Sequence, residues 1–147
     1  MTVRISRPLL QQILAYCADA PEQERCGLLL GDDPACIAAW LPAANVASDP
    51  TKRFEIDPAS LISAHKAART GGMALLGCFH SHPTGSVEPS PCDADLARDD
   101  GQLWLICAGQ THALWRAGAQ GLHGRFTAER LEEVDEVALA SPGTCRQ

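Results

Sequence analysis

The sequence predicts a single α/β domain, of the α+β kind, in which a mixed central β-sheet is flanked by helices. The chain has 147 residues, which suits one domain and allows roughly two thirds of the unfolded surface to be buried. Hydrophobic residues make up 46% of it and charged residues 20%, as is usual for a globular protein. Short apolar runs interleave with segments of helical periodicity, but without the long regular alternation of a doubly wound sheet.

The first third of the chain is expected to form one helix followed by strands. Residues 7–17 have helical periodicity, with their apolar side chains on one face. The run CGLLLG at residues 26–31 reads as a buried strand, and a second strand is expected at 36–41 after an Asp-Asp-Pro turn. Residues 45–52 are expected to form a loop, and residues 53–56 a short strand.

The middle of the chain is expected to alternate helix and strand. A helix over residues 57–72 has Asp-Pro at its start and Gly-Gly at its end, which are typical helix boundaries. The apolar run at 73–79 predicts a strand that leads directly into His80. A further helix is expected over residues 90–101, beginning at Ser-Pro.

The last third is expected to add two strands and a helix. The run at 103–109 predicts a central strand, and a shorter strand begins at 113–115. Residues 124–126 read as extended, and a final helix is expected over 127–140. The last residues, 141–147, are expected to be a flexible tail, so that the single domain ends at residue 140.

The charge of the chain limits the classes of partner that it is expected to bind, and its cysteines indicate the cellular compartment. The net charge of −6 and the pI of about 5.2 argue against nucleic acid or an anionic membrane as a partner, because both attract basic surfaces. No apolar run approaches the roughly 18–20 residues that span a bilayer, and the N-terminus lacks the pattern of a signal peptide. The seven cysteines form no CxxC pair and are expected to be reduced thiols, which predicts a cytoplasmic protein.

The most specific pattern in the chain is HSHPTGSVEPSPCD, residues 80–93. Residues two apart on a strand share a face, so His80 and His82 can present two nitrogen ligands to one cation. Asp93 can supply a third ligand, which would leave one tetrahedral position open, as in catalytic zinc sites. A non-haem Fe(II) site is an alternative. In another reading, Asp93 only completes a helix capping box with Ser90.

With this spacing the chain resembles the JAMM (MPN+) metalloprotease family, whose signature is a distant Glu followed by H-x-H-x(7)-S-x(2)-D. Residues 80–93 match that spacing in full, and segments 21–31 and 53–58 also resemble bacterial and archaeal members. The resemblance spans about residues 5–115 and implies an MPN/JAB-like fold, with an architecture like that of cytidine deaminase.

The resemblance also implies a role for each residue of the motif. His80, His82 and Asp93 would hold one Zn²⁺ ion per chain. Glu24 would take a proton from the zinc-bound water and pass it to the leaving amine, and Ser90 would hydrogen-bond the tetrahedral oxyanion.

The identity of the base is open between two acidic residues. Glu22 lies two residues before Glu24 and would point to the same side of a strand. The Glu-x-Cys-Gly register of the family favours Glu24.

The family cleaves amide or isopeptide bonds after the C-terminal Gly-Gly of ubiquitin or ubiquitin-like proteins. This chain is similar to the stand-alone bacterial type, which implies a small ubiquitin-like sulfur carrier as the partner, bound through its C-terminal tail. Two alternatives remain: a peptidase acting on other small peptides or amides, and a non-catalytic MPN scaffold.

Overall fold

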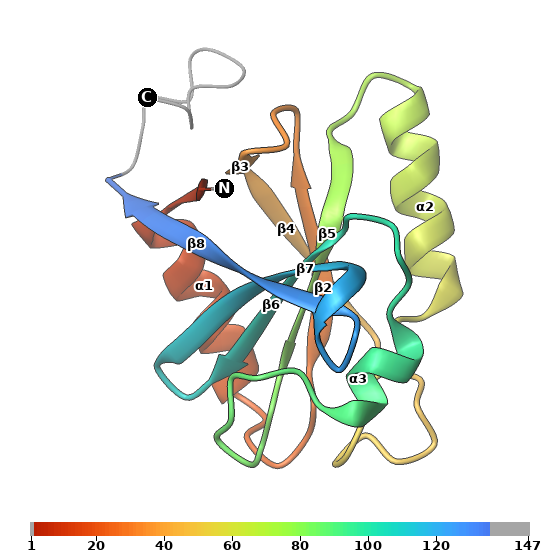
Figure 1. Cartoon of the computed structure of the whole chain (residues 1–147). Coiled ribbons are helices and arrows are strands. Elements are labelled where there is room, and N and C mark those ends of the chain that lie inside the picture. The colour runs from red at the N-terminus through yellow and green to blue at the C-terminus, as the bar shows by residue number, and fades with distance from the viewer. Residues whose placement is uncertain (1, 136–147) are drawn as a thin grey trace.

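The computed structural model describes residues 2–135 of the chain. Within that range eight strands form one sheet and three helices pack beside it (Figure 1). The strands are β1 (Thr2–Ser6), β2 (Cys26–Gly31), β3 (Cys36–Ile37), β4 (Ala39–Ala43), β5 (Ala74–Ser81), β6 (Leu103–Ala108), β7 (Thr111–Leu122) and β8 (Phe126–Val134). The helices are α1 (Arg7–Ala18), α2 (Pro58–Arg69) and α3 (Pro91–Leu96).

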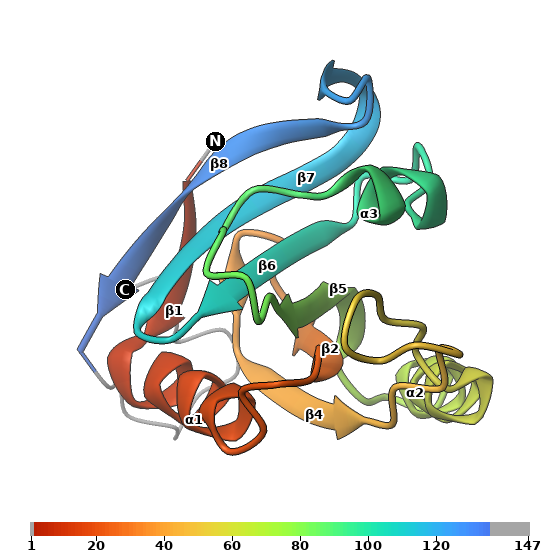
Figure 2. The ribbon, with the colours of Figure 1, turned by 90° about the horizontal axis from the view of Figure 1, so that it is seen from below.

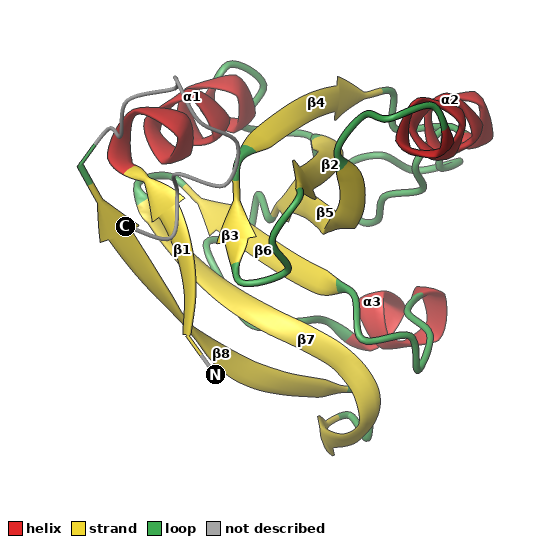
Figure 3. Ribbon diagram, turned by 90° about the horizontal axis from the view of Figure 1, so that it is seen from above, coloured by secondary structure: helices red, strands yellow, loops and turns green. Residues whose placement is uncertain are grey.

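The sheet is mixed and its strands run in the order β3-β1-β8-β7-β6-β5-β2-β4. Strand β5 lies parallel to β6 and antiparallel to β2, while β1 lies parallel to both β3 and β8. Helix α1 lies on one side of β5 and β6, and α2 and α3 lie on the other (Figure 3). The predicted fold class, a mixed sheet flanked by helices, is therefore confirmed.

The face of the sheet under α1 holds the larger apolar core. Helix α1 begins at Ser6, whose hydroxyl accepts a hydrogen bond from the Leu9 backbone N–H (3.2 Å). The helix buries one apolar stripe, as its periodicity predicts. That stripe packs against buried side chains of the strands, and together they form a cluster of Val3, Ile5, Leu10, Ile13, Leu14, Cys17, Leu29, Ile37, Phe79, Leu103, Leu105, Cys107 and Leu114.

The opposite face holds a second, smaller apolar cluster. Side chains alternate along a strand, so on β5 Phe79 faces α1, whereas Cys78 and His80 face the other way. Trp104 on β6 lies on the same face as Cys78, and Phe54 from the loop before α2 covers them. His80 thus lies at the edge of this apolar cluster, one residue before the end of β5.

The helix predicted over 127–140 is wrong for residues 127–134. These residues form strand β8, which pairs with β7 on one side and β1 on the other. The segment is rich in good helix formers such as Glu, Leu, Ala and Arg, but pairing with two strands outweighs that preference. Residues 136–140 of the predicted helix and the predicted tail at 141–147 lie outside the described residues.

Three shorter predictions also need correction. The helix expected over 90–101 ends at Leu96, because Ala97 is extended (φ −70°, ψ 155°). The strand expected at 53–56 is reduced to one bridge between Asn45 and Ile56. The strand beginning at 113–115 is the longer β7 of 12 residues, since a long antiparallel partner extends it.

The strand expected at 36–41 is divided into β3 and β4. Strand β1, at the N-terminal end, was not predicted. Of the segment expected to be extended at 124–126, residues 124 and 125 lie in a turn and only Phe126 belongs to β8. The remaining elements agree with their predicted positions. They are the helix at 7–17, the helix after Asp57, and the strands at 26–31, 73–79 and 103–109.

Two expectations about the environment can be compared with the structure. Five cysteines are free thiols, namely Cys17, Cys26, Cys78, Cys92 and Cys107. Cys36 is disulfide-bonded, so the expectation of reduced thiols is wrong for this residue. Among residues 2–135, no helix combines the length and the apolar character needed to cross a bilayer.

Candidate metal centre

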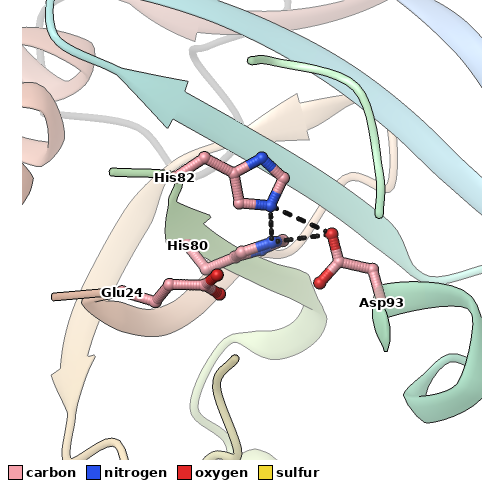
Figure 4. Close-up of side chains that lie close together, drawn as sticks. All are labelled: Glu24, His80, His82 and Asp93. Carbon is pink, nitrogen blue, oxygen red and sulfur yellow. Dashed lines mark hydrogen bonds and ion pairs between the residues drawn. The ribbon is translucent and has the colours of Figure 1, made fainter. Parts of the chain in front are cut away.

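Four polar side chains are buried together beside the end of β5. Glu24, His80, His82 and Asp93 have exposed fractions of 5%, 0%, 7% and 3%. One ligand atom from each lies within 4.8 Å of the others, and Figure 4 shows their polar ends pointing toward one another. They come from three segments: the residues before β2, the end of β5, and helix α3. Burial of so many titratable groups in one place is typical of a functional site.

Three of these ligand atoms form a nearly equilateral triangle. The Nε2 atoms of His80 and His82 are 3.1 Å apart, and Asp93 Oδ2 lies 3.2 Å from the first and 3.1 Å from the second. Two ligands at about 2.0 Å from a tetrahedral zinc stand about 3.3 Å apart. The triangle therefore has the size that a small divalent cation requires, and the residues fit the metal that the family resemblance implies.

Different contacts orient the two imidazoles. His82 Nδ1 lies 2.8 Å from the carbonyl oxygen of Ser86. A carbonyl can only accept, so Nδ1 carries a proton, and in the neutral ring Nε2 then has the lone pair that a metal ligand needs. His80 is stacked on Phe54 (centroids 4.1 Å apart, rings 21° from parallel) and meets the edge of Trp104 at 5.5 Å. Its Nδ1 is buried without a hydrogen-bond partner, so aromatic packing orients the ring on that side, while Nε2 contacts His82 and Asp93.

Asp93 takes part in the helix cap and in the cluster at the same time. The Ser90 hydroxyl accepts from the Asp93 backbone N–H (3.0 Å), and Asp93 Oδ2 accepts from the Ser90 backbone N–H (2.9 Å), which completes a capping box. The same Oδ2 atom faces both histidines. The two readings of the Ser-x-x-Asp spacing are therefore compatible, because the cap holds the carboxylate where the histidines meet.

Glu24 is buried at the cluster, whereas Glu22 is exposed. Burial raises the pKa of Glu24 to about 7, an effect that His82 opposes and Asp93 reinforces. Its Oε1 atom is buried without a hydrogen-bond partner. The structure thus brings Glu24, and not Glu22, to the histidines.

The histidines and Asp93 shift one another's pKa in opposite directions. Burial lowers the pKa of His80, and Asp93 only partly offsets this. Burial also acts to lower the pKa of His82, but the Asp93 carboxylate outweighs it and raises that pKa. Burial acts to raise the pKa of Asp93, yet hydrogen bonds from the two histidines hold it well below its usual range. A carboxylate that stays ionised suits a cation ligand.

Comparison with known sequences assigns the chain to a family. The family of prokaryotic homologs of the JAB domain matches residues 6–118. The chain belongs to this family. The match includes all of the clustered residues, and the predicted resemblance to JAMM (MPN+) proteins is confirmed.

Two curated proteins are similar to this JAB domain. A desampylase from Haloferax volcanii is 37% identical over 92 residues, which cover 62% of this chain and 66% of that protein. A probable TtuB-protein conjugate cleaving protease from Thermus thermophilus is 33% identical over 124 residues, covering 78% of this chain and 82% of that protein.

Solved structures with the same fold support the assignment to the JAB domain. A protein from Desulfitobacterium hafniense has a TM-score of 0.79 at 27% identity, covering 95% of this chain and 97% of its own. A JAB1/MPN domain protein from Archaeoglobus fulgidus has a TM-score of 0.58 at 21% identity, covering 89% of this chain and all of its own. At this identity the second comparison supports the fold alone.

In this JAB domain Ser90 is joined to the cluster through the α3 cap. Its hydroxyl oxygen accepts from the Asp93 backbone N–H, which leaves the hydroxyl proton free to be donated. The loop that carries Ser90 is tied to β7 and the turn after it. Trp115 Nε1 donates to the Val87 carbonyl, and His123 Nε2 donates to the Pro89 carbonyl, both at 3.0 Å.

Sequence reasoning missed the residues that support the cluster of the JAB domain. Phe54 and Trp104 pack around His80, and His123 holds the loop before Ser90. His123 has φ 56°, a conformation that tight turns require and that His adopts more often than most residues. The only signal for Phe54 was its place in the segment 53–58 that resembles the family, and Trp104 gave no signal beyond its strand.

Proposed function

We propose that this chain is a metal-dependent peptidase that hydrolyses the amide or isopeptide bond at the C-terminal Gly-Gly of a ubiquitin-like protein. One observation carries the proposal. Two imidazole nitrogens and one carboxylate oxygen converge within 3.2 Å, with the buried carboxyl group of Glu24 beside them. Membership of the JAB family and similarity to two conjugate-cleaving or desampylase proteins support it.

His80, His82 and Asp93 would hold the metal, and the set of two nitrogens and one carboxylate favours Zn²⁺. A divalent cation bound there supplies Lewis acidity, which polarises a carbonyl oxygen and lowers the pKa of a bound water. The Ser86 carbonyl and the α3 cap would fix His82 and Asp93 for that task. Packing against Phe54 would do the same for His80.

Glu24 would act as the general base and then as the general acid. A pKa of about 7 lets a carboxyl group take up and release a proton near neutral pH, where proton transfer is most effective. The group would accept a proton from the attacking water and donate it to the leaving amine. Such a group contributes about 10²–10⁴-fold to the rate.

Ser90 would donate a hydrogen bond to the oxyanion of the tetrahedral intermediate. The α3 cap fixes the hydroxyl oxygen through the Asp93 N–H, so its proton can point away from the helix. A positioned donor of this kind contributes roughly 10²–10³-fold.

The substrate class is inferred from chemistry and from the relatives. Glycine has no side chain, so a Gly-Gly tail lets its backbone approach a buried site closely. One relative is named for cleaving conjugates of a protein called TtuB. Within this class we favour a small ubiquitin-like sulfur carrier, from which the enzyme would remove residues attached beyond Gly-Gly.

Two other functions lead to different results in the same assays. A non-catalytic MPN scaffold would bind a partner without hydrolysing it. A peptidase of wider range would cleave small peptides that lack a ubiquitin-like domain. The full set of buried polar residues at the cluster favours an enzyme over a scaffold, since such groups are costly to bury without a function.

The test compares matched glutamate variants on one substrate. The protein is incubated with Zn²⁺ and a ubiquitin-like protein extended beyond Gly-Gly, and the products are weighed by mass spectrometry. We expect cleavage after Gly-Gly, a loss of about 10²–10⁴-fold in Glu24→Gln, and full activity in Glu22→Gln, whose side chain is exposed. Turnover of unrelated peptides without cleavage of the extended protein would refute the substrate class, and binding without any turnover would favour the scaffold.

We also propose that the protein works in the cytoplasm, because five of the six cysteines among residues 2–135 are free thiols, with Cys36 the exception, and reducing compartments favour free thiols. Cell fractionation tests this. Recovery of the protein from the exported fraction would contradict it.

A further inference from the structure

We infer that Asn45 positions the proposed general base. The inference rests on the proposed function, in which Glu24 carries the proton. Asn45 is remote from the JAMM motif in sequence, and the hydrogen bonds of its side chain go to Glu24, Ala47, Arg53 and Glu55, none of which is a predicted metal ligand. It acts on the backbone that carries Glu24 and on the loop that carries Phe54.

The segment that carries Glu24 has no regular structure of its own. Residues 24 and 25 lie between a turn and the start of β2, so no ladder of hydrogen bonds fixes the Glu24 peptide groups. Both of them find partners in the loop before α2: the Glu24 N–H donates to the Pro50 carbonyl, and the Glu24 carbonyl accepts from Asn45 Nδ2, each at 2.7 Å. The residues on either side are held by β5, because the Ser81 hydroxyl donates to the Gln23 carbonyl (3.3 Å) and accepts from the Arg25 N–H (2.9 Å). The backbone position of Glu24 therefore depends on that loop together with Ser81.

Every hydrogen-bonding site of the Asn45 carboxamide is used. Nδ2 donates to the carbonyl oxygens of Glu24 (2.7 Å) and Arg53 (3.0 Å). Oδ1 accepts from the backbone N–H groups of Ala47 and Glu55, both at 3.0 Å. A carboxamide offers two donors and two main acceptor sites, so this side chain is held in one orientation. Asn and no other residue of its length supplies this set.

The same carboxamide connects the two sides of the metal centre. Its partners Arg53 and Glu55 flank Phe54, whose ring stacks on His80. Its remaining long-range partner is Glu24. Asn45 thus sets the Glu24 backbone relative to the ring that packs on His80, and a small displacement here would move the carboxyl group away from the substrate.

Asn45→Asp removes the contact with Glu24 and keeps most of the hydrogen bonds that the side chain makes within the loop. The retained oxygen can still accept from Ala47 and Glu55, whereas the bond to the Arg53 carbonyl is lost. The second oxygen replaces Nδ2 and faces two carbonyl oxygens, so the contact with Glu24 becomes repulsive. Asn45→Ala, which introduces no charge, is the second variant in case the first fails to fold.

Asp57→Ala is the matched control. Asp57 follows the same loop and caps α2 by accepting from the Ala59 N–H (3.1 Å), but it does not contact Glu24. Its loss destabilises the protein without moving the base. A role of Asn45 in stability alone would give both variants the same activity at temperatures where both are folded.

The experiment measures kinetics, metal content and structure for each variant. We expect Asn45→Asp to lower kcat by about 10²-fold, the loss that a displacement of about 1 Å can cause, with KM and zinc content unchanged. In a Glu24→Gln background the same substitution should have no further effect, because its target is already disabled. The crystal structure of the variant should show the Glu24 carboxyl group displaced, with His80, His82 and Asp93 in place.

The outcomes separate this inference from the proposed function. If wild-type protein cleaves its substrate and Asn45→Asp does so equally well with Glu24 unmoved, the positioning role is refuted. If Glu24 moves in the variant but wild-type protein cleaves no extended ubiquitin-like protein, the positioning stands and the proposed function fails. An equal fall in kcat for Asp57→Ala would also refute the inference.

Discussion

The two faces of the sheet around β5 and β6 bury different kinds of side chain. The face under α1 is a closed apolar core, in which thirteen buried residues pack on one another. On the other face the apolar cluster gives way, at the end of β5, to four buried polar side chains. Phe79 and His80 are neighbours in the sequence, yet one belongs to the core and the other to the candidate metal centre.

This difference separates stability from function within a single sheet. Burying apolar area stabilises the fold by about 25 cal/mol per Å², so the α1 face gains from every contact. Burying polar groups without partners is costly, and the candidate metal centre contains two such atoms, Glu24 Oε1 and His80 Nδ1. Such an arrangement is retained in proteins where chemistry needs it. Figure 2 shows the two regions on either side of β5 and β6, with α1 on one side and α3 on the other.

The largest effect on stability is expected from the α1 face. Leu105 is fully buried in the core of that face. Leu105→Ala should lower the free energy of unfolding by about 2–5 kcal/mol, while the folded protein still binds one zinc ion. Urea denaturation measures the change. Leu41→Ala serves as the control, because Leu41 is 45% exposed and should change stability by less than about 0.5 kcal/mol.

The converse effect is expected at the metal centre. Asp93→Asn keeps an oxygen that can accept the capping hydrogen bond but removes the negative charge that faces the histidines. Losing an outer partner of a ligand weakens metal binding by about 10–100-fold, so losing a ligand's charge should weaken it by more, with little change in folding. Zinc titration with a competing chelator gives the affinity. Equal zinc affinity in the variant and in wild-type protein would show that Asp93 is not a ligand.

The burial of Glu24 should appear in the pH dependence of the metal-free protein. The folded pKa of Glu24 is raised from 4.5 to about 7, so the native state binds more protons than the unfolded state between these values. Stability must therefore fall as the pH rises through that window, by about 1 kcal/mol or more. In Glu24→Gln the loss should be smaller, and in Glu22→Gln it should match wild-type protein. Denaturation after chelation, from pH 4 to 8, gives these curves, and identical slopes in all three proteins would contradict the assignment.

A smaller effect is expected from Phe54, which packs both in the smaller apolar cluster and on His80. Phe54→Leu removes the ring that stacks on His80 but keeps an apolar side chain. A stacked aromatic pair contributes about 0.5–1.5 kcal/mol, so zinc affinity should weaken by about three- to tenfold. The same titration measures it. An effect as large as that of Asp93→Asn would mean that Phe54 does more than orient His80.

Local patterns in the sequence predicted the parts of the site that are close along the chain. His80, His82, Ser90 and Asp93 lie within 14 residues. Strand alternation pairs His80 with His82 and the capping box pairs Ser90 with Asp93, whereas the loop between them brings the two pairs together. Glu24 came only with the family resemblance, because 56 residues separate it from His80. The geometry now places Glu24 at the cluster and leaves Glu22 exposed.

The parts that sequence reasoning missed depend on long-range contacts. Asn45 and Phe54 reach the site through a loop whose turns and single bridge have no strong periodicity. Strand β8 was mistaken for a helix because its helix-forming residues give no hint that β7 and β1 pair with it. In both cases the structure depends on contacts between residues far apart in the sequence, and local sequence patterns do not predict such contacts.

The central claim is that the two imidazoles and the Asp93 carboxylate hold one divalent cation. Anomalous diffraction at the zinc absorption edge, from crystals grown with Zn²⁺, tests it most directly. We expect one peak per chain, at about 2.0–2.2 Å from His80 Nε2, His82 Nε2 and Asp93 Oδ2. A peak elsewhere, or no peak while these three atoms remain hydrogen-bonded to one another, would contradict the claim.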